Sequence, residues 1–361
     1  MLNVAIIGCG AVVADLHVPA ILRLRRSGVL RVAALVDPNR ERANMLQREF
    51  PEAVVCDTAK QALAAGKVEV VLVASPPGLH EEHALGALAA GSHVLLEKPM
   101  ADRVRSAENI AAAAERAEKA LAIALPRRYF PCMAEVASLV RAGDLGDDLA
   151  FQYREGSAYD WQVATDAPFR RAVSGGGVLM DKGAHVLDTV EQIFGESEVL
   201  SARDDSLEGG VEANTVIELR CRLGRGTVQL SWDQALYNGL WITGSRGTVW
   251  VDLGEIETFR RREADGRWRV VRPEVSWPAD TKPTPRRFVR PWGYHDCIFL
   301  EWVNFLRAVL LGAPPAVSGC AALGVMRTIE AAYAAAVPLD LPWLEAEERD
   351  RQRTSHWRAE P

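Results

Sequence analysis

The stretch LNVAIIGCG, Leu2–Gly10, sets the architecture of the first half of the chain. An apolar run ends in two glycines, and an alanine-rich helical pattern opens immediately afterwards. A strand, a glycine turn and a helix in this order form the context of a dinucleotide-binding fingerprint. Gly8 would make the tight turn, and Gly10 would let the backbone approach a pyrophosphate at the helix N-terminus. The third glycine position holds Val13, which predicts a slightly larger distance between helix and strand.

A second apolar run, 31–36, ends directly in Asp37-Pro38. An acid at this position accepts hydrogen bonds from the ribose hydroxyls of an adenosine and repels a 2′-phosphate, so NAD is favoured over NADP. Alternatively, Asp37 caps the helix that we predict over 39–50, and the two roles are compatible. Arg40 lies close by in the sequence, and its positive charge would pair with a 2′-phosphate. Arg40 would therefore still allow NADP to bind.

Strands and helices then continue to alternate. We predict strands at 68–73, 92–96 and 121–125, and helices at 59–65, 79–90 and 104–119. Strands that alternate with helices in this way predict a doubly wound parallel sheet. The carboxyl ends of such strands border one crevice, the usual ligand site of this architecture. The residues at these ends are Gly8, Asp37, Ser75 and Lys98.

The segment Glu97-Lys98-Pro99 follows the apolar residues 94–96. Proline has no N–H and does not continue a central strand, so the strand stops and Lys98 lies at its carboxyl end. This position favours a role for Lys98 in the crevice. The alternative is that Glu97 and Lys98 form an exposed, charged turn.

Bulk composition narrows the class of protein. The chain has 361 residues, of which 48% are hydrophobic and 25% charged, as is typical of a globular protein of about two domains. A net charge of −6 and scattered arginines argue against nucleic acid as a partner. Six cysteines without metal-like spacing indicate a reducing, cytoplasmic location. We find no signal peptide and no apolar run long enough to span a membrane.

In the second half of the chain, the pattern over 178–190 predicts a helix that carries Asp181 and His185 on one face. A carboxylate beside an imidazole can orient the ring and help to pass a proton. The three glycines of 175–177 suit a backbone that passes close to a ligand. Alternatively, His185 is a buried structural residue bonded to Asp181 or Asp188. A metal site made of these three residues lacks a fourth ligand, so we predict no metal.

The rest of the second half predicts an open sheet followed by two helices. We expect a meander of strands with turn signals between 199 and 271, a long loop over 273–291, and helices over 292–311 and 318–336. Tyr294 begins the first of these helices and would either line the crevice or only start the helix. The charged residues 343–361 predict a frayed tail. Trp232, Trp241 and Trp250 would anchor an oligomer interface or pack in the core.

Taken together, these motifs resemble the glucose-fructose oxidoreductase/inositol dehydrogenase/rhizopine-catabolism (Gfo/Idh/MocA) family. The resemblance covers 2 to about 338. Its marks are Gly8-x-Gly10, Asp37, the segment 75–80 with His80, Glu97-Lys98-Pro99, and Gly176-Gly177 followed by Asp181, Gly183, His185 and Asp188. Lys182 departs from the small or apolar residue expected at its position.

The resemblance implies an α/β Rossmann domain over 1–124 and an α+β domain with a large, mainly antiparallel sheet over 125–361, which would form a homodimer or homotetramer. It implies hydride transfer between NAD and a secondary alcohol or ketone of a sugar, nucleotide-linked sugar or cyclitol. His185 would act as acid/base, Lys98 would stabilise the alkoxide, and Asp181 would orient both. The residues expected to hold the cofactor are Gly8, Gly10, Ala11, Val12, Asp37, Pro38, Arg40, Ser75, Pro76, His80, Glu97 and Lys98. Those expected to touch the substrate are Arg127, Arg128, Tyr159 and Tyr294.

Two other functions remain open. One is a glycoside-cleaving enzyme that retains its NAD and oxidises the sugar only transiently. The other is a redox-sensing NAD(P)-binding protein without turnover, against which the set of Lys98, Asp181 and His185 argues. The two enzyme readings differ in whether added NAD is turned over.

Overall fold

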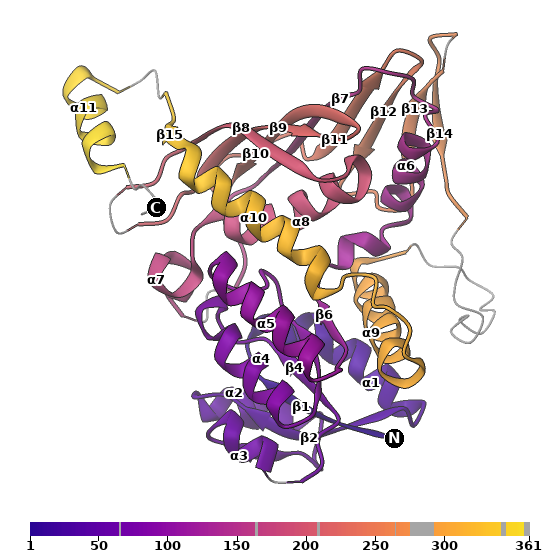
Figure 1. Cartoon of the computed structure of the whole chain (residues 1–361), viewed down its shortest axis with the longest axis vertical. Helices are drawn as coiled ribbons and strands as arrows, with labels where there is room; N and C mark the ends of the chain where they lie inside the picture. Colours follow the sequence, from indigo (N-terminus) through magenta and orange to yellow (C-terminus); the bar gives the residue numbers. More distant parts are fainter. Residues whose placement is uncertain are drawn as a thin grey trace. The chain divides into compact units, whose positions relative to one another are not determined.

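The computed structural model describes residues 1–64, 66–162, 165–207, 210–263, 265–274, 292–340 and 344–356. These residues form two compact units, which Figure 1 shows with the elements labelled. The first unit comprises Met1–Pro126, Gln162–Gly175 and Tyr294–Met326. The second comprises Arg127–Trp161, Gly176–Gly293 and Arg327–Pro361. Each unit is therefore assembled from stretches that are distant in the sequence.

The first unit contains a six-stranded sheet in the order β3-β2-β1-β4-β5-β6, with every pair parallel. This confirms the predicted doubly wound architecture. The three central strands are almost entirely buried, which is why they read as continuous apolar runs rather than as alternating ones. The strands are β1 (Leu2–Ile7), β2 (Leu30–Val36), β3 (Val54–Cys56), β4 (Val70–Val73), β5 (His93–Leu96) and β6 (Leu121–Ile123).

Helices follow these strands as the alternation predicts. The helix after β1 contains a π-helical turn, Val13–His17, which begins at the residue in the third glycine position. The C-terminal helix α9 (Tyr294–Leu311) returns to this unit and packs against α1 (Val18–Arg26) (Figure 1). The others are α2 (Arg40–Gln47), α3 (Ala59–Ala64), α4 (His80–Ala89), α5 (Val104–Arg116) and the short α7 (Arg171–Ser174).

The second unit contains a nine-stranded sheet in the order β14-β13-β12-β11-β7-β10-β9-β8-β15. The predicted meander is wrong in one respect, because β7 lies between β10 and β11 and pairs in parallel with β10. Strand β7 precedes α8 in the sequence, so no hairpin turn signals its partners. The strands are β7 (Ala150–Gly156), β8 (Ser197–Asp204), β9 (Asn214–Cys221), β10 (Gly224–Ser231), β11 (Gly239–Gly244), β12 (Gly247–Asp252), β13 (Phe259–Arg262), β14 (Trp268–Val271) and β15 (Ala336–Pro338).

Helix α8 (Val178–Phe194) packs against β8, β9 and β10 and against α6 (Pro131–Arg141). Helix α10 covers Gly319–Ala335. The tail that we expected to fray contains helix α11 (Ala346–Ser355), which begins with a capping box of Glu345 and Glu348. Most of the predicted loop, 275–291, lies outside the described residues. Among the helices that the structure describes, none is long and apolar enough to cross a membrane.

Glu191 on α8 predicts a pH-dependent stability of the second unit. Ser197 Oγ and Thr328 Oγ1 both donate to its Oε1 at 3.1 Å, but burial raises its pKa to about 7. The native state therefore holds a proton that the unfolded chain releases from about pH 4.5 upwards, and stability falls as the pH rises from there to about 7. Over this pH range the free energy of unfolding falls by roughly 3 kcal/mol, because a shift of one pKa unit corresponds to about 1.4 kcal/mol.

We expect Glu191→Gln to abolish this loss, because glutamine stays neutral and can accept both hydrogen bonds. Urea unfolding at pH 5 and pH 8 measures the effect, and the variant should gain on the wild type only at the higher pH. Glu198→Gln is the matched control, since Glu198 is exposed and paired with Arg220. An equal gain at both pH values would contradict the assignment.

Candidate active site

The glycine turn after β1 has the geometry that a bound dinucleotide requires. Gly8 has a φ of +96°, and a Cβ there would collide with the backbone of Ala74 at the end of β4. A Cβ at Gly10, in contrast, would meet no atom within 4 Å. Ala11 and Val12 occupy the first turn of the helix, where backbone N–H groups have no acceptor within the helix. Orphan donors beside open space suit the phosphates of a dinucleotide.

Asp37, at the end of β2, holds this turn in place. Its Oδ2 accepts from the Cys9 N–H at 2.8 Å, and its Oδ1 accepts from the Asn39 N–H at 2.8 Å. The N-cap of α2 is Asn39, which accepts from the Glu41 N–H, so the capping alternative for Asp37 is wrong. Each carboxylate oxygen still has a second lone pair. Asp37 therefore fits a partner with two ribose hydroxyls.

The neighbours of Asp37 carry little further chemistry. Pro38 and Arg40 are exposed, and Arg40 Nη1 lies 3.4 Å from Asp57 Oδ1 in a surface ion pair. Burial, followed by the charge of Asp37, raises the pKa of the Cys9 thiol to about 12. Cys9 is therefore an inert thiol at neutral pH.

At the end of β4, Ser75 and Pro76 are half-buried, and the Ser75 hydroxyl contacts His83 Nδ1 at 2.9 Å. His80 is completely buried, with Nε2 at 2.7 Å from the Ser75 carbonyl and Nδ1 at 3.0 Å from the Pro99 carbonyl. The contact with the cofactor that we expected of His80 stays a prediction. His80 ties the end of β4 to the residues after β5.

The segment after β5 presents Lys98 and buries Glu97. The Lys98-Pro99 bond is cis, and the Lys98 side chain is half-buried. Glu97 is 7% exposed, with one carboxylate oxygen at His17 Nε2 and the other accepting the Lys98 N–H at 3.0 Å. The contact of Glu97 with the cofactor stays a prediction. Tyr294, the remaining candidate of this unit, is half-buried at the first residue of α9.

In the second unit, Asp181 and His185 lie one turn apart on α8, as predicted. Asp181 is half-buried and His185 is 8% exposed. Tyr159 lies within electrostatic range of this helix, because its pKa is raised by burial and then by the charge of Asp181. Lys182, whose direction was open, donates from Nζ to the Ser157 hydroxyl at 3.1 Å. An acid, an imidazole and a phenol thus belong to this part of the unit.

The glycines before α8 allow close contacts within the second unit. A Cβ at Gly176 would collide with the Tyr333 hydroxyl, and a Cβ at Gly177 with the backbone of Glu212. Glu212 is fully buried, and its carboxylate accepts from the N–H groups of Gly177 and Leu179 at 3.0 Å and from Tyr333 Oη at 2.7 Å. The glycines thus make room for a carboxylate that caps α8. No sequence pattern singled out Glu212, because it precedes β9 and is distant from α8 in the chain.

Two further candidates of the second unit form ion pairs. The Arg128 guanidinium donates to Asp188 from Nε at 3.0 Å and from Nη2 at 2.6 Å. Arg127 donates to both carboxylate oxygens of Glu155, at 2.6 and 2.8 Å, and to Tyr153 Oη. Bidentate pairs of this kind orient the surrounding strands and helices. The substrate contacts expected of Arg127 and Arg128 stay a prediction.

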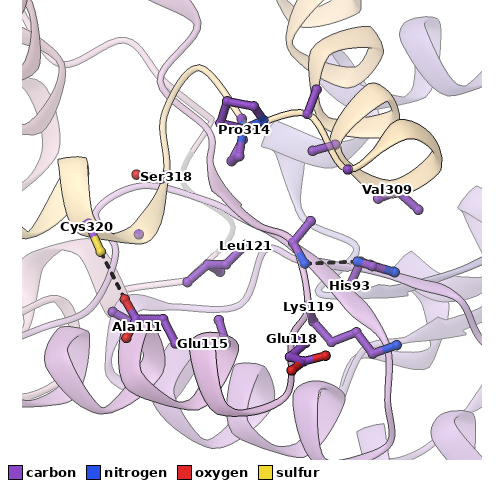
Figure 2. A pocket seen from close by; sticks show the side chains of 17 residues that line it. His93, Ala111, Glu115, Glu118, Lys119, Leu121, Val309, Pro314, Ser318 and Cys320 are labelled. Carbon is purple, nitrogen blue, oxygen red and sulfur yellow. Dashed lines mark hydrogen bonds between the residues drawn. The ribbon is translucent and has the colours of Figure 1, made fainter.

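A separate cavity of about 480 Å³ lies in the first unit, between α5, β6 and the connection from α9 to α10 (Figure 2). Its lining includes His93, Glu115, Lys119 and Cys320, with Cys320 Sγ at 3.4 Å from Glu115 Oε1. It contains none of the predicted site residues. Among the described residues, no group of three histidines, cysteines or carboxylates has a metal-binding arrangement.

The first unit contains a Rossmann sheet with a glycine turn, Asp37 and Lys98 at its strand ends. The second unit contains a large mixed sheet. A chain with these two units has the architecture of a dinucleotide-binding protein. Residues 2–125 match the model of an oxidoreductase family with an NAD-binding Rossmann fold, and residues 133–250 match the C-terminal domain model of the same family. The chain belongs to the Gfo/Idh/MocA family.

Known proteins support this assignment. The chain is 28% identical to scyllo-inositol 2-dehydrogenase (NADP(+)) of Bacillus subtilis (strain 168) over 66% of each chain. It is 33% identical to D-glucoside 3-dehydrogenase of Escherichia coli (strain K12) over 57% of this chain and 58% of the relative. The matched region thus spans about two thirds or less of these relatives. A structure of levoglucosan dehydrogenase in complex with NADH and levoglucosan shares the fold, with a TM-score of 0.78, 20% identity, and coverage of 91% of this chain and 95% of that one.

Proposed function

We propose that this chain is an NAD-dependent oxidoreductase that transfers a hydride between nicotinamide C4 and the secondary alcohol or ketone carbon of a sugar, nucleotide-linked sugar or cyclitol. The observation that carries the proposal is the row of strand ends in the first unit. The neighbouring parallel strands β2, β1, β4 and β5 end in Asp37, the Gly8–Gly10 turn, Ser75 and Lys98, respectively. In this architecture the ligand lies beyond these ends.

The residues of the first unit fit the adenosine half of the cofactor and its phosphates. Asp37 would accept the ribose hydroxyls, and the first helical turn after Gly10 would bind the pyrophosphate. When bound, the nicotinamide supplies the hydride acceptor and donor. The protein has to place the substrate and to move one proton.

We assign the proton and the oxygen of the substrate to three residues. In the oxidation direction, His185 takes the hydroxyl proton as the carbon loses its hydride, and it returns the proton in the reduction direction. Lys98 stabilises the developing alkoxide through its positive charge. Asp181, one helical turn from His185, orients the imidazole. The substrate class rests on the relatives, whose names give an inositol and a glucoside as substrates.

The test is a panel of sugars, cyclitols and nucleotide sugars assayed by NADH absorbance, with the bound cofactor identified after denaturation. We expect NADH formation with at least one polyol class. Release of a glycosidic leaving group without net NADH would indicate the glycoside-cleaving alternative. Binding of NAD without turnover of any compound would indicate a sensor.

Asp37→Ala should weaken NAD binding more than tenfold and reduce the preference for NAD over NADP. Two hydrogen bonds to a charged acceptor are lost, each worth about 1.5–3 kcal/mol, and the Cys9 N–H loses its acceptor as well. Isothermal titration with both cofactors measures the change. Asn39→Ala is the matched control, because it removes the cap of α2 and costs about 1 kcal/mol of stability without touching the ribose site. Unchanged dissociation constants in Asp37→Ala would limit Asp37 to holding the turn.

We further propose a homodimer or homotetramer formed through the open sheet of the second unit. Of the tryptophans expected to anchor it, Trp232 and Trp250 are buried, whereas Trp241 is 41% exposed and stacks edge to face on the exposed Trp268. Trp241→Glu with Trp268→Glu should lower the sedimentation mass to that of a smaller assembly. An unchanged mass would place the interface elsewhere.

We also propose a cytoplasmic location, because none of the six cysteines forms a disulfide bond.

A further inference from the structure

A buried chain of hydrogen bonds lies behind the Glu97-Lys98 segment, entirely inside the first unit. The indole Nε1–H of Trp302 on α9 donates to Nδ1 of His17, in the π-helical turn, at 2.9 Å. The two rings meet edge to face with their centroids 6.0 Å apart, and both residues are completely buried. Because Nδ1 accepts this bond, the proton of the imidazole is on Nε2.

The Nε2–H of His17 donates in turn to Glu97 Oε1 at 2.7 Å, and Glu97 Oε2 accepts the backbone N–H of Lys98 at 3.0 Å. Burial acts to raise the pKa of Glu97, but the hydrogen bond from His17 and the charge of Lys98 outweigh it, so that the net pKa is lowered. Glu97 is therefore a charged carboxylate. His17 orients the carboxylate of Glu97 through one oxygen, and the other oxygen of that carboxylate holds the backbone of Lys98.

Glu301, the neighbour of Trp302 on α9, completes the cluster. It is 3% exposed, and neither carboxyl oxygen has a hydrogen-bond partner among the described residues. Burial and then the charge of Glu97 raise the pKa of Glu301 well above its usual value. Of the two carboxyl groups in the cluster, only that of Glu97 is hydrogen-bonded to His17 and to the Lys98 amide.

Core stability does not account for this arrangement. A buried charge with its donors is often no more stabilising than apolar residues of the same volume. Here three elements that are distant in the sequence, the π-helical turn, the end of β5 and α9, supply the chain, and its last bond is to the Lys98 amide. We propose that the Trp302–His17–Glu97 chain is a positioning unit that fixes Lys98 for its work on the substrate oxygen. This inference rests on the proposed function.

Glu97→Gln is the first test, made on the full chain with bound NAD. The single side-chain oxygen of glutamine can accept a hydrogen bond from His17 Nε2–H or from the Lys98 N–H, but not from both. Its amide N–H₂ group then faces the other donor, and that hydrogen bond is lost. We expect kcat to fall about 10–100-fold, the scale for a lost support of a catalytic group, with little change in KM. Glu301→Gln is the matched control in the same cluster and should keep kcat, because neither carboxyl oxygen of Glu301 forms a hydrogen bond to Trp302, His17, Glu97 or Lys98.

The Lys98→Met background separates positioning from general damage. If Glu97 acts through Lys98, Glu97→Gln should lower kcat little further once Lys98 is gone. A full additional loss would overturn the proposal. His17→Gln keeps both an acceptor and a donor and should retain much more activity than His17→Leu. Equal losses of activity in these two variants would also count against the Trp302–His17–Glu97 chain of hydrogen bonds.

Hydrogen exchange at the Lys98 amide tests the chain without any turnover. We expect faster exchange of this amide in Glu97→Ala and in His17→Leu than in the wild type, and unchanged exchange in Glu301→Gln. If no compound is turned over but the exchange responds, the proposed function fails and the positioning of the segment stands. If turnover is found but neither exchange nor the double-variant kinetics responds, the positioning unit is wrong and the proposed function stands.

Discussion

Replacing Lys98 by methionine is expected to lower kcat by about 10²–10⁴-fold, the range found when an oxyanion partner or an acid/base is lost. Methionine keeps most of the side-chain volume, and Lys98 is half-buried after the end of β5, so the fold should persist. Single-turnover hydride transfer, followed through NADH absorbance with NAD already bound, measures the chemical step apart from product release.

The matched control for Lys98→Met is Lys119→Met, a change of the same kind at the cavity of Figure 2. It should leave hydride transfer unchanged. A wild-type rate in Lys98→Met would show that Lys98 is not catalytic, and it would return Glu97 and Lys98 to the charged turn that the sequence alone also allows.

His185→Asn should have an effect of similar size, about 10²–10⁴-fold, because the only group assigned to accept the hydroxyl proton is removed. An imidazole that transfers a proton makes the rate depend on pH in the neutral range, and this dependence should disappear in the variant. Rates from pH 6 to 9 (a span chosen around the ordinary imidazole pKa of about 6.5) measure both effects. His93→Asn, in the separate cavity, is the control.

The double variant Lys98→Met/His185→Asn tests whether the two residues serve one proton. If they do, its loss should be much smaller than the product of the single losses. Hydride transfer near the wild-type rate in His185→Asn would leave His185 in a purely structural role on α8, where its carbonyl accepts the Thr189 hydroxyl.

The elements that could be predicted from sequence are those whose signals are local. The turn at Gly8 needs a positive φ, the segment after β5 ends at a proline, and the apolar spacing of 178–190 has the helical period. From such signals follow the parallel sheet, the residues at its strand ends, and the placement of Asp181 and His185 one turn apart. The short β3 was missed, because three residues show no period.

Partners that meet only in space were decided by the tertiary structure. Trp302 and His17 are 285 positions apart, yet their hydrogen bond determines which nitrogen of His17 faces Glu97. Glu212 likewise reaches α8 from outside it. A pattern of residue types records which face of an element is apolar, but not which distant side chain will cover it, because that choice depends on the packing of all the elements together. The sequence therefore determined where the reactive groups stand along the chain, and the fold decided which residues hold them there.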